Sequence, residues 1–183
     1  SAATTNSNIN NTEALVTGTW VMPNCTKKLA NINGHYIRQV ESHHLAMEIL
    51  PKLHARGIAT PPFDTIVGAM DALKVRSADM NALVDGTMFL WADRPLVLAE
   101  PLSDEDKLIL LRVYNYVSQA EWNHDAIMAA LNGAAESLGI KLGKAVAPLR
   151  MALTGSRNSP PITDCLTLLG NRESQARIRD ALA

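Results

Sequence analysis

Apolar residues recur at intervals of three and four along most of the chain, which is the spacing of one face of an α-helix. In the first such segment Leu45, Ile49 and Leu53 are four apart, and Pro51 predicts a kink or a fresh start of the helix. No run of six or more residues alternates between apolar and polar as a half-buried strand does. We therefore predict an all-α fold, with helices over residues 42–55, 63–73, 80–91, 103–118, 123–138, 142–154, 159–169 and 171–183.

Capping residues and glycines mark the ends of these helices. Ser103 precedes three acidic residues, as an N-cap before an acidic first turn does. Gly139 followed by Ile140 is typical of a left-handed helix stop with its apolar contact. Gly155 closes the next helix, and Gly170 is expected to separate the last two.

Composition divides the chain into four parts. Residues 1–26 begin with a polar stretch without period, and we expect a disordered leader or a segment foreign to the natural protein. Residues 27–93 and 103–183 each hold several helices, whereas residues 94–102 contain two prolines and are the predicted linker. The predicted architecture is therefore two small helical subdomains.

The 183 residues include 47% apolar and 19% charged side chains, which suits a folded core and argues against a disordered chain. No apolar run approaches the roughly 18 residues that a membrane helix needs. Cys25 and Cys165 lack the spacing of a metal site, and so few cysteines indicate a reduced, cytoplasmic setting.

The net charge of −1 argues against a nucleic-acid-binding protein, since such proteins are usually basic. The charge is unevenly distributed, however. Residues 1–140 hold ten lysines and arginines against fifteen acids, whereas residues 141–183 hold seven against three. The positive end suggests that only this part meets an anionic partner, although a solvated helix face explains the charge equally well.

The sequence contains no convincing catalytic or metal site. His43 and His44 point to different faces of a helix, and His54 lacks the three- or four-residue spacing that would place it beside His44. We therefore expect all three histidines at the surface. His124 beside Asp125 is not expected to form a catalytic pair, because neighbours on a helix do not face each other. No glycine-rich phosphate loop occurs, and neither a metal nor a cofactor is expected in this chain.

One segment combines cations with a stiff loop. In residues 141–162 a helix with Lys144 and Arg150 leads into a loop with Arg157 and Ser159, followed by two prolines. Proteins that read single-stranded RNA need cations for phosphates and fixed polar groups for base edges. From the residues alone, an ordinary helix–loop–helix still explains the segment better.

A resemblance changes that balance. The stretches KLGKAVAPLRMALTG, S-P-P and LTLLGNRES (residues 141–174), together with NINGHYIRQV (residues 31–40), closely resemble the C-terminal anticodon-binding domain of bacterial-type glutamyl-tRNA synthetases. The resemblance covers about residues 27–183. It implies an all-helical domain that selects glutamate tRNA by its anticodon loop.

The catalytic part of such a synthetase attaches glutamate to tRNA with ATP and magnesium. Its H-x-G-H and K-[M/I]-S-K motifs do not occur here, so we expect a fragment of a ligase that is inactive alone. The implied partners are glutamate tRNA and the catalytic domain of the same enzyme. A cytoplasmic monomer without membrane contact is expected.

The resemblance also implies where tRNA binds. The arginine with which this family reads an anticodon base, and favours glutamate tRNA over glutamine tRNA, falls at Arg76. Further base contacts fall on the end of the cationic helix and on its loop, where many family members have Pro-Gly instead of two prolines. Lys144 and Arg157 are added as phosphate neighbours from their charge alone. The predicted tRNA-binding residues are Arg76, Lys144, Arg150, Arg157, Ser159, Pro160 and Ile162.

Two alternatives stay open. A helical adaptor derived from the same scaffold would bind a protein through the acidic surface of residues 1–140. A small helical enzyme would use His124 or His43.

Overall fold

The computed structural model describes residues 34–59, 61–157 and 159–183, and all regular structure in these residues is helical. A helix over residues 34–39 comes first. It is followed by α2 (Ser42–Ala55), α3 (Phe63–Leu73), α4 (Met80–Thr87), the 3₁₀ helix η1 (Met88–Trp91), α5 (Asp104–Val117), α6 (His124–Leu138), α7 (Leu142–Thr154) and α8 (Ile162–Leu182). The predicted all-α fold is confirmed, whereas the predicted leader lies outside the described residues.

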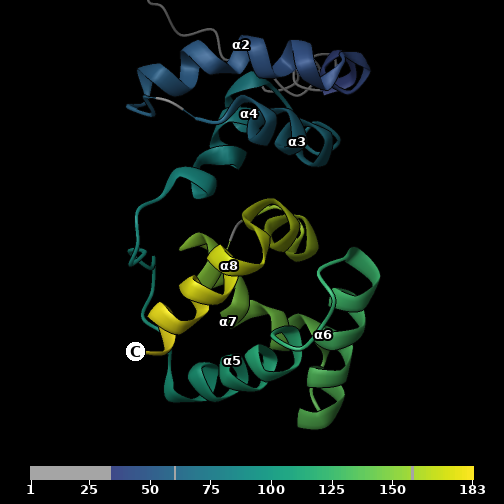
Figure 1. The fold of residues 1–183 in the computed structure, drawn as a ribbon, viewed down its shortest axis with the longest axis vertical. Helices are drawn as coiled ribbons and strands as arrows, with labels where there is room; N and C mark the ends of the chain where they lie inside the picture. The colour runs from purple at the N-terminus through teal and green to yellow at the C-terminus, as the bar shows by residue number, and fades with distance from the viewer. Residues whose placement is uncertain (1–33, 60, 158) are drawn as a thin grey trace, which may run out of the picture.

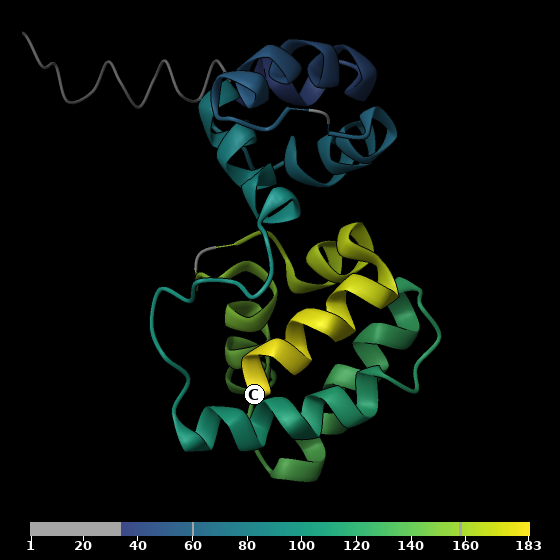
Figure 2. The same ribbon diagram turned by 60° about the vertical axis from the view of Figure 1, so that its left-hand side comes forward.

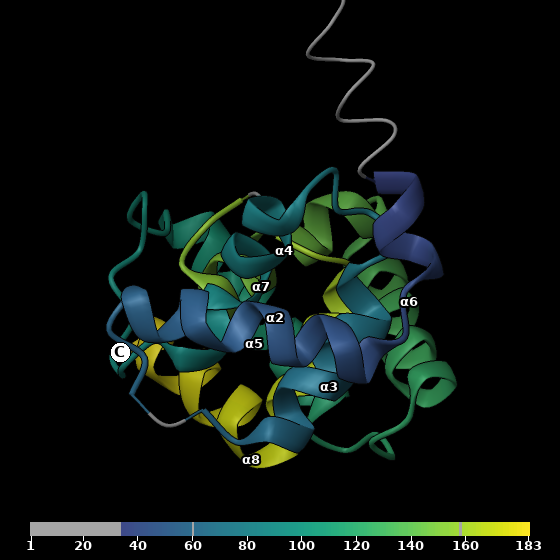
Figure 3. The same ribbon diagram turned by 90° about the horizontal axis from the view of Figure 1, so that it is seen from above.

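The helices form two groups that follow one another along the long axis of the molecule (Figure 1). The N-terminal group contains α2, α3, α4 and η1, and the C-terminal group contains α5 to α8. Residues 92–103 connect them as an extended segment along one side of the molecule (Figure 2). Seen along the long axis, α2 crosses the N-terminal group, with α5, α7 and α8 beneath it (Figure 3).

Each group has an apolar core of its own. The N-terminal core is built from the predicted apolar face of α2 with buried residues of α3 and α4, among them Leu45, Ile66 and Leu83. Burying each such side chain contributes about 1.5–3 kcal/mol. Leu168 of α8 packs against this N-terminal core, so α8 reaches from one group to the other. The buried residues of the C-terminal core are Ile109, Leu110, Val113, Val117, Ile127, Leu131, Ala134, Ala135, Ala145, Val146, Leu149, Ala152, Leu153, Ile162, Leu166 and Ile178.

The first turns of α5 and α6 show why these helices begin where the sequence predicts. Ser103 and Asp106 form a capping box, in which the Asp106 N–H donates to Ser103 Oγ over 3.1 Å and the Ser103 N–H donates to the Asp106 carboxylate over 3.2 Å. The Asn123 side chain accepts from the Ala126 N–H over 2.8 Å at the start of α6. Of the two expectations at Pro51, a kink or a fresh start, the fresh start is wrong, because α2 continues through this residue as one helix.

The two prolines move the start of the last helix. α8 begins at Ile162, not at Ser159, because a residue that precedes proline is disfavoured in helical geometry and Ser159 and Pro160 both precede one. Gly170, with φ 73° and ψ 169°, is non-helical and separates two helical stretches within α8. The predicted break at Gly170 is confirmed.

One buried cation joins the two groups. The side chain of Arg177 on α8 is only 2% exposed. Its Nη1 donates to the carbonyl oxygens of Phe89 over 2.8 Å and Leu153 over 2.7 Å, and its Nη2 donates to that of Ala92 over 3.2 Å. Its Nε donates to the Glu173 carboxylate over 2.8 Å. The guanidinium therefore connects η1, the start of the extended segment and the end of α7.

The extended segment lies directly on the C-terminal end of α7. The Ala99 N–H donates to the Gly155 carbonyl over 2.8 Å. Gly155 has φ 72°, and a Cβ at this position would lie 2.9 Å from the Val97 carbonyl oxygen. Both the left-handed conformation and this close approach require glycine.

We expect Gly155→Ala to lower the free energy of unfolding more than Gly139→Ala does. Both glycines have positive φ, which costs another residue about 1–2 kcal/mol, but a Cβ at Gly139 meets nothing within 4 Å. The clash with the Val97 carbonyl should add about 1–3 kcal/mol at Gly155 alone. Urea unfolding followed by circular dichroism measures both variants, and equal losses would contradict the expectation.

Candidate nucleic-acid interface

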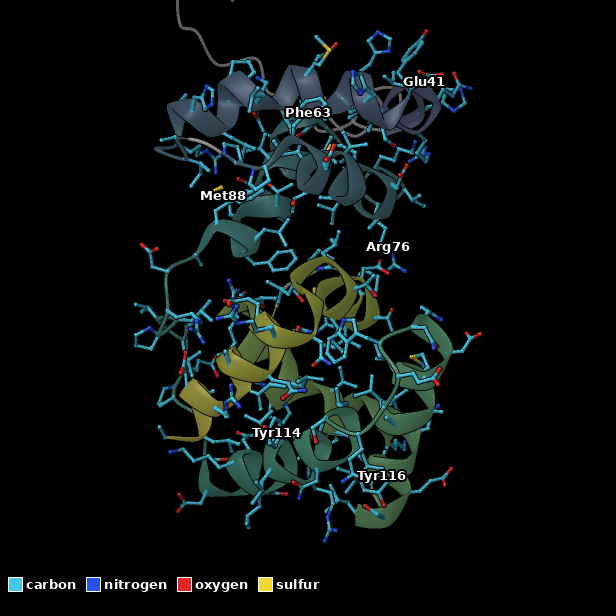
Figure 4. All side chains as sticks on the ribbon, viewed as in Figure 1. Glu41, Phe63, Arg76, Met88, Tyr114 and Tyr116 are labelled. Atoms are coloured by element: carbon cyan, nitrogen blue, oxygen red, sulfur yellow. The ribbon has the colours of Figure 1, made fainter. Side chains whose placement is uncertain are left out.

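Two adjoining pockets bring most of the predicted tRNA-binding residues together. The first, of about 460 Å³, is lined by Arg76, Arg150, Arg157 and Ile162 among others. The second, of about 490 Å³, is lined by Arg76 again, with Ser159 and Pro160. We call the two pockets together the groove. Figure 4 shows Arg76 at the edge of the N-terminal group that faces the C-terminal group, so the groove is shared between the groups.

Arg76 lies in the turn between α3 and α4 and is exposed. Its own N–H and the N–H and hydroxyl of Ser77 all donate to the Leu73 carbonyl, over 3.1, 3.2 and 2.9 Å. These bonds satisfy the C-terminal end of α3 and hold the turn in place. The Arg76 guanidinium forms no ion pair or hydrogen bond with the residues that the structure describes, so its donors are available to a ligand.

Arg150 shapes the loop between α7 and α8. Its Nη1 donates to Ser159 Oγ over 2.7 Å, to the Ser159 carbonyl over 2.9 Å and to the Pro160 carbonyl over 2.8 Å. The remaining guanidinium nitrogens of Arg150 make no hydrogen bond within the described ranges. Arg150 thus fixes the loop backbone and keeps donors that can reach a phosphate or a base edge from the same side chain.

Ser159, Pro160 and Ile162 contribute differently to the groove. The Ser159 hydroxyl accepts from Arg150 and lies 3.1 Å from the Pro160 carbonyl. Ile162 is only 7% exposed and belongs to the C-terminal core. It therefore supports the floor of the groove and offers a ligand little surface.

The two cations chosen for their charge are both paired with acids. Lys144 Nζ lies 2.6 Å from Glu105 on α5, a hydrogen bond that raises the pKa of Lys144, and Lys144 lines neither pocket of the groove. Arg157 Nη2 lies 2.8 Å from the Glu100 carboxylate. The side chains of Arg157 and Glu100 are both mostly exposed, and an exposed ion pair stabilises a protein by only about 0–1 kcal/mol. Arg157 can therefore exchange Glu100 for a phosphate.

The histidines do not form a second site. His43, His44 and His54 are exposed, as predicted. His124 Nδ1 lies 3.2 Å from Asp125 Oδ1, so the expectation that these neighbours would not meet is wrong. The contact forms in the first turn of α6, where both side chains extend into solvent. No group of three His, Cys, Asp or Glu side chains in the described part of the chain could hold a metal ion.

None of the helices among the described residues is long and apolar enough to cross a membrane.

A family model described as an anticodon binding domain matches residues 28–182. The chain belongs to the anticodon-binding domain family. It is 45% identical over 166 residues to glutamate–tRNA ligase 2 of Novosphingobium aromaticivorans, covering 86% of this chain and 34% of that protein. It is 40% identical over 160 residues to glutamate–tRNA ligase 1 of Erythrobacter litoralis, covering 84% and 32%. This anticodon-binding domain therefore spans about a third of the length of these relatives.

The fold has a counterpart among solved structures. The crystal structure of a glutamate tRNA ligase from Elizabethkingia meningosepticum in complex with its amino acid matches with a TM-score of 0.68. The match covers 82% of this chain and 30% of that one at 19% sequence identity. The resemblance to glutamyl-tRNA synthetases is confirmed by the family and by these relatives, and the helical fold by the structural match.

A buried thiol lies beneath the loop of the groove. Cys165 Sγ is 3.6 Å from the Pro160 carbonyl and 4.0 Å from Ser159 Oγ. Burial raises the pKa of the Cys165 thiol from its ordinary 9.0 to about 11, although Ser159 and Arg150 act in the opposite direction. At pH 8 the thiol is therefore both covered and protonated.

We expect Arg150→Ala to expose this thiol, because it removes the donor that holds Ser159 and Pro160 over Cys165. In a Cys25→Ser background at pH 8, Cys165 should react slowly with a disulfide reagent such as DTNB, and Arg150→Ala should accelerate the reaction at least tenfold. Arg112→Ala, which changes an exposed arginine of α5 outside the groove, is the control and should leave the rate unchanged. A parent protein that reacts as fast as unfolded chain would contradict the expectation.

Proposed function

We propose that this anticodon-binding domain binds the anticodon loop of glutamate tRNA in the groove. The observation that carries the proposal is the convergence of Arg76 with the α7–α8 loop, two segments far apart in the sequence that line the same pocket. In this proposal the two predicted subdomains, residues 27–93 and 103–183, each provide one side of the binding site.

The chemistry of the groove suits unstacked bases. The Arg76 guanidinium presents up to five donors in one plane, which can bond the acceptors of a base edge in pairs. On the opposite side, Pro160 and Pro161 restrain the backbone at their own positions, and proline nitrogens offer no competing donor. Backbone that is fixed before binding loses little entropy when RNA binds.

We further propose that the chain is the tRNA-selecting part of a longer glutamate–tRNA ligase. Its relatives are ligases of about three times the matched length, which supports this placement. ATP and magnesium would be used by the catalytic domain, and this chain would act by delivering the tRNA, as a monomer in the cytoplasm. The comparisons favour this function over a protein-binding adaptor or an enzyme built on His124 or His43.

Arg76→Ala should weaken the binding of glutamate tRNA about tenfold and remove the preference over the same tRNA with a glutamine anticodon. A bidentate arginine contact to a base contributes about 1–3 kcal/mol of discrimination, which is the reason for this magnitude. Filter binding at one fixed salt concentration measures both affinities, since the phosphate contribution depends strongly on salt.

Arg112→Ala serves as the matched control, because it removes an exposed arginine that lines neither pocket. Its affinity for both tRNAs should stay within twofold of the parent chain. Equal binding of the two tRNAs by the parent chain would overturn the proposed anticodon selection.

A further inference from the structure

The width of the groove depends on how the two helical groups are held together. Arg76 comes from the N-terminal group, whereas Arg150 and the loop belong to the C-terminal group. Direct contacts between the groups involve α3 with α8 and η1 with α7. Leu168 on α8 also packs against the N-terminal core, with its Cδ2 4.0 Å from where a Cβ of Gly68 on α3 would lie.

Arg177 forms hydrogen bonds with backbone at, or next to, residues that line the second pocket from both helical groups. Phe89, whose carbonyl accepts from Arg177, also lines the second pocket. Leu153, whose carbonyl accepts from the same Nη1, immediately precedes Thr154, which lines that pocket from the other side. A single guanidinium is thus bonded both to η1 and to the C-terminal end of α7.

Two carboxylates hold this arrangement in place. Glu173 accepts from Arg177 Nε, and Arg94 of the extended segment lies 3.6 Å from Glu173 and 3.6 Å from Asp180. All four charged groups therefore connect α8 with the start of the extended segment. A lysine at position 177 would keep the charge, but its single nitrogen could not span carbonyls of three segments as the planar guanidinium does.

We propose that Arg177 is a positioning residue for tRNA selection, and that it sets the distance between Arg76 and the α7–α8 loop without touching RNA. This inference rests on the proposed function. Arg177 is 2% exposed and its guanidinium is occupied by protein acceptors, so it acts on RNA only through the groups that it holds. The contribution of Arg76 to binding should then depend on Arg177.

The test compares the effect of Arg76→Ala in two backgrounds. In the parent chain, Arg76→Ala should weaken glutamate tRNA binding about tenfold, whereas in Arg177→Lys the same change should weaken it less than twofold. Arg179→Lys is the matched control, because it makes the same change at an exposed position on the same helix and should preserve the tenfold effect. A tenfold effect of Arg76→Ala in all three backgrounds, with each protein folded by circular dichroism, would overturn the proposal.

Spin labels give a readout that does not depend on RNA. Val75→Cys and Leu108→Cys place labels at exposed positions in the two groups, in a Cys25→Ser background where Cys165 is buried. The distance distribution should be narrow in the parent chain and in Arg179→Lys, and broad in Arg177→Lys. A narrow distribution in Arg177→Lys would overturn the positioning role. Failure of the parent chain to select tRNA would overturn the proposed function instead.

Glu173→Gln is the second variant, in case Arg177→Lys does not fold. It keeps the Arg177 guanidinium and weakens the contacts of residue 173 to Arg177 Nε and to Arg94, so both effects should appear in the same direction with smaller size. Parent-like label distances together with an unchanged effect of Arg76→Ala in Glu173→Gln would count against the proposal.

Discussion

The buried guanidinium of Arg177 is the interaction on which the arrangement of the two helical groups depends. A charge removed from water is costly unless its donors find acceptors, and here the guanidinium makes four hydrogen bonds, to the carbonyls of Phe89, Ala92 and Leu153 and to the carboxylate of Glu173. The dependence is mutual, because the bonds to the Phe89 and Leu153 carbonyls are buried, and a buried carbonyl left unpaired would cost about 1–3 kcal/mol. The helix η1, the extended segment and the end of α7 therefore meet at this guanidinium.

Arg150 repeats this use of arginine at the loop, where one nitrogen gathers three acceptors from Ser159 and Pro160. Net charge is consequently a poor guide to the binding surface of this protein. Of the cations in the positive C-terminal part, Arg177 is buried, and Lys144 and Arg157 are paired with acids from upstream. Arg76, a cation at the groove that forms no ion pair with the described residues, belongs to the acidic part of the chain.

The helices could be predicted from the sequence because their causes are local. Apolar spacing, the cap at Ser103 and the stops at Gly139, Gly155 and Gly170 act within a few residues. The Ser159–Pro160 pair predicts a helix start, but α8 begins at Ile162 because two consecutive prolines disfavour helical geometry at Ser159 and Pro160. The burial of Arg177 could not be predicted, because its acceptors Phe89 and Ala92 lie 88 and 85 residues away and backbone carbonyls carry no sequence signal.

The candidate site could be predicted from the sequence only in part. The resemblance supplied its residues, but only packing shows that Arg76 and the loop share a pocket while Lys144 does not. With only 4% aromatic side chains, the chain has few rings on which bases could stack, so the proposed recognition rests on hydrogen bonds. Hydrogen bonds depend on distance and direction more sharply than stacking does. A groove that selects RNA in this way needs its two sides at a fixed separation, and a buried arginine bonded to backbone on both sides provides that separation.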